Sequence, residues 1–98
     1  MSFLVIVSYD VSTATASGRR RLRRVASICK DYGQRVQNSV FECLVDPEQW
    51  VRFRARLFEE YDDDEDSLRF YFLGKNWQGR KEHYGTKPTT DPEEPLIV

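Results

Sequence analysis

Residues 3–10 read FLVIVSYD, in which five successive apolar side chains are followed by a short polar end that closes with Asp10. A strand that is apolar at every position is buried on both faces, so this segment is predicted to lie in the middle of a sheet. Asp10 then lies where the central strand leaves the sheet. An aspartate there either forms a turn with its own backbone or begins a functional site, and the residues alone leave both possibilities open.

Two amphipathic helices are predicted further along the chain. The first has apolar residues at spacings of three and four and ends at Gly33, which we expect in the left-handed conformation typical of helix ends. Ser17 is the expected N-cap of this helix. The second helix begins after Asp46, with Pro47 in its first position and Gln49 placed to complete a capping box. Each helix therefore has a defined start and one apolar stripe.

The remaining segments complete an α+β plan. Apolar and aromatic patterns predict three further extended segments, at residues 34–39, 40–45 and 67–73. The order βαββαβ is that of a ferredoxin-like sandwich, so residues 1–98 are predicted to form a single domain of this kind. Residues 75–95 have little periodicity and are predicted to be mostly irregular, with a short strand near residues 82–84. The apolar terminus at residues 96–98 is predicted to be an extra strand at a sheet edge.

The two faces of the central strand differ in polarity. Side chains alternate along a strand, so Tyr9 is predicted to face the helices, whereas Ser8 and Asp10 face the other way. Both helices of this plan pack on one face, which leaves the face with Asp10 open. Because that face also carries the apolar residues Leu4 and Ile6, we expect a second copy of the chain to cover it. Such a homodimer brings two copies of Asp10 near each other.

The composition is that of one small domain. The chain has 98 residues, a net charge of −1 and 40% hydrophobic residues, without an apolar run long enough to span a membrane. The apolar start lacks the features of a signal peptide, so we expect a cytoplasmic protein. Cys29 and Cys43 lie in apolar patterns without CxxC spacing, which favours buried reduced thiols over a disulfide or a zinc site.

Charge is distributed unevenly along the chain. Residues 19–35 carry six arginines and one lysine against a single acid. Arginine binds phosphate through two parallel hydrogen bonds, so this cluster favours a polyanion-binding surface over a merely solvated helix face. Residues 59–66 carry seven acids, which we interpret as a solvated loop because their spacing fits no calcium site. His83, the only histidine, has no apparent triad partner and is interpreted as a loop residue.

Asp10 is the candidate metal ligand. Mg²⁺ binds through one or two carboxylates and retains several waters, so two copies of Asp10 at a dimer seam would suit Mg²⁺ or Mn²⁺. A cation bound there would activate water and polarise a phosphodiester oxygen. Tyr9 and Phe41 are interpreted as core or interface side chains rather than base-stacking platforms, because each lies in an apolar strand.

Two segments closely resemble a known family. VSYD at residues 7–10 closes the first strand, and residues 33–42 read GQRVQNSVFE after the arginine-rich helix. Together with residues 66–71, these segments resemble CRISPR-associated protein two, the small subunit of the spacer-acquisition machinery. The resemblance implies a ferredoxin-like homodimer in which residues 96–98 join the partner's sheet. It also implies a divalent metal held between the two copies of Asp10.

The resemblance and the arginine cluster together nominate the functional residues. Tyr9 and Asp10 match motif residues of the family and are the expected catalytic residues, with Asp10 as the metal ligand. The residues expected to bind nucleic acid are Arg19, Arg20, Arg23, Arg24, Arg35 and Phe41.

The expected function is that of an endonuclease dependent on Mg²⁺ or Mn²⁺. Metal-dependent cleavage of RNA or double-stranded DNA is attributed to some members of the family. Others look inactive and serve as a DNA-binding bridge for the integrase subunit, so a non-catalytic scaffold is the alternative hypothesis. Both hypotheses place the chain in CRISPR spacer acquisition and antiviral defence. A single-stranded RNA-binding module of the same topology is a weaker hypothesis, because residues 40–45 lack its basic-aromatic consensus.

Overall fold

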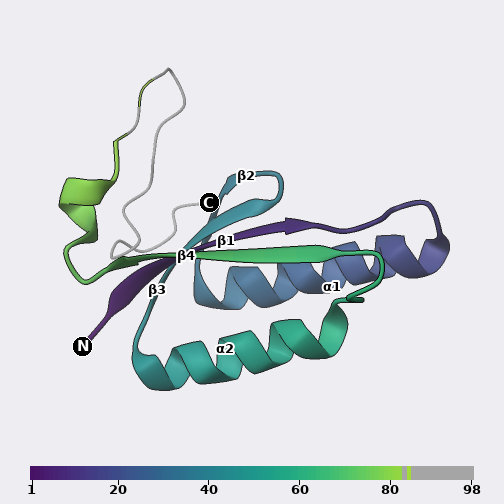
Figure 1. The fold of residues 1–98 in the computed structure, drawn as a ribbon, viewed down its shortest axis with the longest axis horizontal. Helices are drawn as coiled ribbons and strands as arrows, with labels where there is room; N and C mark the ends of the chain where they lie inside the picture. The colour runs from purple at the N-terminus through teal and green to yellow at the C-terminus, as the bar shows by residue number, and fades with distance from the viewer. Residues whose placement is uncertain (83, 85–98) are drawn as a thin grey trace.

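The computed structural model describes residues 1–82 and residue 84, which form a sheet with both helices on one face (Figure 1). The elements in chain order are β1 (Phe3–Asp10), α1 (Ala16–Tyr32), β2 (Gln34–Gln37), β3 (Val40–Val45), α2 (Pro47–Glu60), β4 (Ser67–Gly74) and the 3₁₀ helix η1 (Trp77–Arg80). The α+β, ferredoxin-like fold is therefore confirmed. His83 and the predicted strand at residues 96–98 lie outside the described residues.

β1 lies inside a four-stranded antiparallel sheet with the order β2-β3-β1-β4. Val5 of β1 pairs with Cys43 of β3 on one side and with Phe72 of β4 on the other. Val5 and Val7 on the helix side and Leu4 on the other face have no exposed surface. The uninterrupted apolar run at the start of the chain is thus explained by burial on both faces of a central strand, as predicted.

The hydrophobic core lies between the sheet and the two helices (Figure 1). Phe41 of β3 and Phe53 and Leu57 of α2 are its largest completely buried side chains on that face. Cys29 and Cys43 also lie there, and both are free thiols as predicted. Burial raises the pKa of Cys29 to about 12, so this thiol is neutral and unreactive at physiological pH.

The observed start of α2 agrees with the prediction from sequence, whereas the observed start of α1 differs from it. At α2, the Asp46 carboxylate accepts a hydrogen bond from Gln49 N at 2.7 Å, and Gln49 Oε1 accepts one from Asp46 N at 2.9 Å. At α1, the N-cap is Thr15 rather than Ser17, because the Thr15 hydroxyl accepts from Gly18 N at 3.0 Å. Among residues 1–82 and 84, no helix combines the length and apolar character needed to cross a membrane.

Gly33 ends α1 in an extended conformation with φ −164°, so the left-handed conformation predicted for it is wrong. The requirement for glycine is steric instead. A Cβ atom at this position would meet the backbone carbonyl oxygen of Glu42 and would lie 2.5 Å from Cys43 Sγ. The missing side chain lets the chain pass from α1 into β2 while it lies directly against β3.

The segment after β4 contains structure that the sequence pattern did not reveal. Trp77–Arg80 form η1, within a region predicted to be mostly irregular. A short strand was predicted near residues 82–84. Neither Glu82 nor Tyr84, the two described residues of that segment, lies in a strand, so this prediction is wrong at both. η1 follows Gly74, which pairs with Leu4, and it therefore lies at the end of the sheet where β1 begins (Figure 1).

Part of the face opposite the helices is covered by this segment. Trp77 is buried, and Lys81 Nζ lies 2.6 Å from Glu42 Oε1. Glu42 is buried on that face, and the ion pair with Lys81 compensates its desolvation. The open face of the sheet is thus closed near Leu4 and remains open toward Asp10, at the other end of β1.

Candidate functional site

Asp10 closes β1 at an exposed position on the open face of the sheet. Its backbone pairs with Ser67 of β4, and the neighbouring positions Ser8 and Arg69 pair with each other on the same face. Within the described part of the chain, the Asp10 carboxylate makes no hydrogen bond and no ion pair. A hard cation can therefore approach this carboxylate without displacing a partner among the described residues.

Tyr9 lies on the opposite face of β1 from Asp10. Its ring belongs to the buried core, and its hydroxyl donates to the carbonyl oxygen of Asn38 at 3.4 Å. Burial raises the pKa of the Tyr9 hydroxyl, although hydrogen bonding to Arg35 opposes the rise. The structure therefore does not bring the two predicted catalytic side chains together, because consecutive residues of a strand point to opposite faces.

Tyr9, Phe41 and Arg35 form a stack that leads from the core to the surface. The rings of Tyr9 and Phe41 are stacked with centroids 6.2 Å apart, and the Arg35 guanidinium carbon lies 5.2 Å from the Phe41 ring centroid. Arg35 is exposed, whereas Phe41 has no exposed surface. A direct contact of Phe41 with nucleic acid, which the sequence predicted, does not fit this burial. Phe41 instead supports Arg35 through a cation–π contact.

Four exposed arginines of α1 form a basic surface, named here the α1 arginine surface: Arg19, Arg20, Arg23 and Arg24. Arg19 Nη1 donates to the carbonyl oxygen of Thr13 at 3.2 Å, and Arg24 pairs with Glu60 at 3.6 Å. Arg20 and Arg23 make neither a hydrogen bond nor an ion pair within residues 1–82 and 84. Arg20 and Arg23 are therefore the members most available to phosphate.

Arg21 is not part of this surface, although it belongs to the basic cluster of residues 19–35. Its side chain is only 11% exposed, and its Nε donates to Asp66 Oδ2 at 2.8 Å. Its Nη2 donates to Asp66 Oδ1 at 3.1 Å and also pairs with Glu65 at 3.2 Å. The Asp66 hydrogen bond raises the pKa of Arg21. The acids of residues 59–66 are therefore not all solvated, because Asp66 has no exposed side-chain surface.

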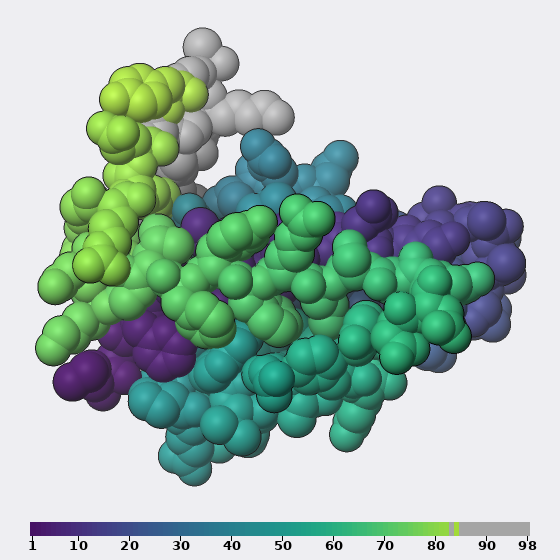
Figure 2. All heavy atoms as spheres, in the orientation of Figure 1, coloured from purple at the N-terminus to yellow at the C-terminus, as the bar shows by residue number. Residues whose placement is uncertain are grey.

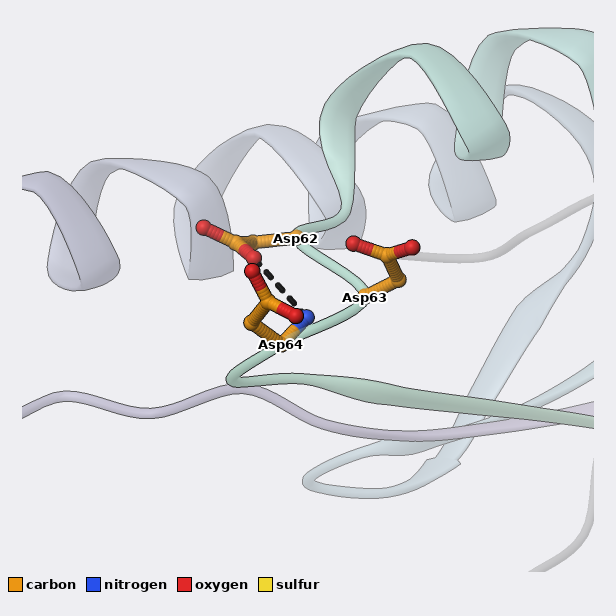
Figure 3. A group of neighbouring side chains, drawn as sticks. All are labelled: Asp62, Asp63 and Asp64. Carbon is orange, nitrogen blue, oxygen red and sulfur yellow. Dashed lines mark hydrogen bonds between the residues drawn. The ribbon is translucent and has the colours of Figure 1, made fainter.

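The other acids of this segment agree with a solvated turn. Asp62, Asp63 and Asp64 have carboxylate oxygens within 4.8 Å of one another (Figure 3). Asp64 N donates to Asp62 Oδ1 at 2.9 Å, and Asp63 and Asp64 are exposed. Hydrogen bonds from backbone N–H groups to a nearby aspartate are ordinary in turns, so the grouping has a local explanation.

Asp66→Asn should make the melting temperature less dependent on acid pH. The Arg21 guanidinium, together with the N–H groups of Asp62 and Ser12, holds the pKa of the Asp66 carboxyl below its ordinary value. The charged carboxylate therefore stabilises the fold above the ordinary aspartate range near pH 4, and this stabilisation is lost as pH falls through the folded-state pKa. Melting curves from about pH 7 to about pH 3 should show the wild-type advantage shrinking in acid. A constant advantage would contradict the assignment.

Arg69 is a further candidate site residue that the sequence pattern did not reveal. β4 begins at Ser67, and alternation from Ser67, the partner of Asp10, places Arg69 on the open face. Arg69 is exposed. The sequence pattern of β4 is dominated by its aromatic residues, so Arg69 did not stand out. The pairing of β4 with β1, which places Arg69 near Asp10, is a long-range contact that no local pattern encodes.

The order βαββαβ, with an antiparallel four-stranded sheet and both helices on one face, defines a ferredoxin-like domain. The family model described as CRISPR associated protein Cas2 matches residues 1–81. The chain therefore belongs to the Cas2 family, which confirms the family resemblance found in the sequence.

Curated relatives and solved structures support this membership. The chain is 58% identical over 97 residues to the CRISPR-associated endoribonuclease Cas2 of Nitratidesulfovibrio vulgaris, covering 99% of this chain and 95% of the relative. It is 51% identical over 94 residues to the CRISPR-associated endonuclease Cas2 of Halalkalibacterium halodurans, covering 96% and 98%. The crystal structure of Streptococcus pyogenes Cas2 at pH 6.5 matches with a TM-score of 0.73 and 58% identity, over 84% of this chain and 99% of that chain.

Proposed function

We propose that this chain is a divalent-metal-dependent endonuclease that hydrolyses phosphodiester bonds of RNA or double-stranded DNA in CRISPR spacer acquisition and antiviral defence. The observation that carries the proposal is Asp10, an exposed carboxylate without a partner among the described residues, at the end of the central strand. The relatives at 58% and 51% identity are named endoribonuclease and endonuclease, which supports the same reaction class.

Mg²⁺ or Mn²⁺ is the proposed cofactor, and Asp10 from each of two copies would hold it. The donor type fits, because these cations prefer carboxylate oxygens and water. When bound, the cation would supply Lewis-acid stabilisation of the phosphate and an activated water. By register, Ser8, Ser67 and Arg69 are the nearest side chains on the open face, and none of them is a general base at neutral pH.

The proposal requires a homodimer, because one copy supplies a single carboxylate at this position. Ile6, Val40 and Leu44 are half-buried on the open face, and Tyr71 is 50% exposed there. A second copy packed on this face would remove these apolar side chains from water. β4 pairs with β1 on one side only within the described residues, and its side chains form a band across the face shown in Figure 2. Its outer edge is where the partner's residues 96–98 would pair.

The basic residues are proposed to hold the nucleic acid. Arg20 and Arg23 would bind backbone phosphates directly, with Arg19 and Arg24 beside them on the α1 arginine surface. Arg35 would bind a further phosphate from the top of its aromatic stack. Tyr9 and Phe41 take a positioning role, since both are buried and their rings support Arg35.

The alternative is a non-catalytic scaffold that binds duplex DNA and bridges the integrase subunit. It is favoured by the placement of the basic residues. Arg35 shares the helix-side face with Phe41, and the α1 arginine surface lies in the helix layer, whereas Asp10 lies on the open face. A protein built this way can hold nucleic acid without presenting it to Asp10 of the same copy.

The decisive assay measures cleavage by purified wild-type protein on single-stranded RNA and on duplex DNA, with Mg²⁺, with Mn²⁺ and with chelator. We expect cleavage with either cation and none with chelator. Cleavage that persists in chelator would refute the metal-dependent reaction. Spacer acquisition in cells separates the two functions: the scaffold predicts that Asp10→Ala acquires spacers normally, while charge reversal at Arg20 and Arg23 abolishes acquisition.

Arg20→Ala and Arg23→Ala should weaken binding of RNA and DNA in a salt-dependent way. Each lost phosphate contact should lower the slope of log K against log salt concentration by about 1. Arg52→Ala is the matched control, because Arg52 is an exposed arginine of α2 that pairs with Glu48 at 3.4 Å. Fluorescence anisotropy at several salt concentrations measures the slopes. Equal slopes for all three variants and the wild type would remove the α1 arginine surface from the proposal.

A further inference from the structure

The Asp66 carboxylate is the best-connected buried polar group among the described residues. It accepts four hydrogen bonds, two on each oxygen. Oδ2 accepts from Arg21 Nε at 2.8 Å and from Asp62 N at 3.0 Å. Oδ1 accepts from Arg21 Nη2 and from Ser12 N, each at 3.1 Å. This single side chain therefore joins α1, the α2–β4 connection and the β1–α1 connection.

One of these hydrogen bonds and one covalent connection tie Asp66 to the backbone around Asp10. Ser12, whose N–H binds Asp66, follows Asp10 by two residues. Ser67 follows Asp66 directly, and it pairs with Asp10 across the sheet. Asp66 is thus connected to Asp10 through the chain that leaves β1 and through the strand beside it.

The β1–α1 connection also lies directly against the first turn of α1. A Cβ atom at Gly18 would meet the backbone carbonyl oxygen of Ser12. Ser12 is therefore held from two sides, by Gly18 of α1 and by the Asp66 carboxylate. An amide in place of the carboxylate would set an NH2 donor against one pair of the four donors that bind it, and would so weaken the hold on this contact.

We propose that Asp66, fixed by Arg21, is a positioning residue that holds Asp10 in place for the divalent cation. This inference rests on the proposed function for its use of the cation. The inference gives a function to the buried Asp66 carboxylate, which is neither a metal ligand nor part of the α1 arginine surface. Groups that orient metal ligands commonly change metal affinity by about 10–100-fold when they are replaced.

A purely stabilising role for Asp66 predicts a different pattern. A buried ion pair that only stabilised the fold would lower the melting temperature of a variant without acting selectively on Asp10. Val45→Ala serves as the matched control for such a loss. Val45 is buried in the hydrophobic core between the sheet and the helices. It pairs with Phe3, at the end of β1 far from Asp10.

The experiment compares wild type, Asp66→Asn, Val45→Ala and Asp10→Ala below the melting temperature of each. Manganese titration of the metal-free proteins, followed by electron paramagnetic resonance, measures affinity. Hydrogen exchange measures the opening of the backbone at Val11 and Ser12. For Asp66→Asn we expect affinity about 10–100-fold weaker and faster exchange at these two amides. We also expect a lower kcat with an unchanged KM for RNA, since the α1 arginine surface is untouched. Val45→Ala should match wild type in manganese affinity, in amide exchange at Val11 and Ser12, and in kcat and KM.

The two readouts separate the failure of this inference from the failure of the proposed function. Unchanged exchange at Val11 and Ser12 in Asp66→Asn overturns the positioning role, whatever the metal results are. If wild type binds manganese through Asp10 and Asp66→Asn binds it equally well, the positioning role also fails while the nuclease proposal stands. If exchange is faster but wild type and Asp10→Ala bind manganese alike, Asp66 orders the Asp10 segment and the metal site is refuted.

Discussion

Asp10→Asn is expected to reduce cleavage of RNA or duplex DNA by about 1,000-fold, because loss of a bound cation removes several kcal/mol of transition-state stabilisation. Asparagine keeps the size of the side chain and removes its charge. Asp10 is exposed and makes no contact among the described residues that the fold depends on, so the melting temperature should change little. Initial rates with Mg²⁺, measured at saturating substrate, give the size of the effect.

The control for Asp10→Asn is Asp63→Asn, which removes an exposed carboxylate from the acidic turn. Asp63→Asn should cleave at the wild-type rate. Light scattering should show that both variants have the same molar mass as wild type. If the purified Asp10→Asn protein cleaves as fast as wild type, Asp10 has no part in catalysis and the observed activity belongs to a contaminant.

Gly33→Val is expected to lower the free energy of unfolding by about 3 kcal/mol, at the upper end of the range for overpacked cores. The cause is the close approach of α1's end to β3. The new side chain would meet the carbonyl oxygen of Glu42 and the Cys43 Cα, which lies 2.8 Å from the site of the added Cβ. Backbone atoms of a paired strand cannot move aside without breaking hydrogen bonds of the sheet.

Gly79→Val is the matched control for this steric effect. A Cβ atom at Gly79 would have no heavy atom within 4 Å, and Gly79 is exposed. Urea unfolding followed by circular dichroism gives the free energies of both variants. A domain of this size has a total stability of about 5–15 kcal/mol, so the loss at Gly33 should be obvious. Equal stability of the two variants would show that β3 yields to the added side chain.

The enzyme and scaffold hypotheses place different demands on the same residues. Cleavage needs Asp10, its partner copy and a phosphate brought to the open face. Binding needs only Arg20, Arg23 and Arg35, which lie toward the helix layer. The proposed dimer would reconcile the two demands if nucleic acid held by the arginines of both copies passed the seam where the two Asp10 carboxylates would meet.

Local pattern was sufficient to predict most of the elements. The apolar run of residues 3–10 predicted a central strand, and the capping box at Asp46 and Gln49 predicted the start of α2. Both predictions are confirmed, because burial on both faces and a reciprocal pair of hydrogen bonds each depend on residues close in sequence. The prediction of Ser17 as N-cap was wrong by two residues, since Thr15 and Ser17 offer the same hydroxyl chemistry.

The site residues were predicted from sequence patterns and from the family resemblance. The structure separates them into exposed and buried residues. Asp10 and Arg35 are exposed and available to a ligand. Tyr9 and Phe41 are buried in the core, and the Phe41 ring lies under Arg35. An aromatic residue in an apolar strand gives no local signal of whether an arginine from the next strand covers it.

The amino-acid sequence was enough to place the strands and helices in order, to centre β1 in the sheet and to put Asp10 at its end, because periodicity of apolar residues encodes which face of each element is buried. Tertiary structure alone decided the role of three residues. Arg21 joins Asp66 across 45 positions, Gly33 is required by the backbone of β3, and Phe41 lies under Arg35. Each of these roles depends on a contact between separate elements, and no spacing within one segment encodes such a contact.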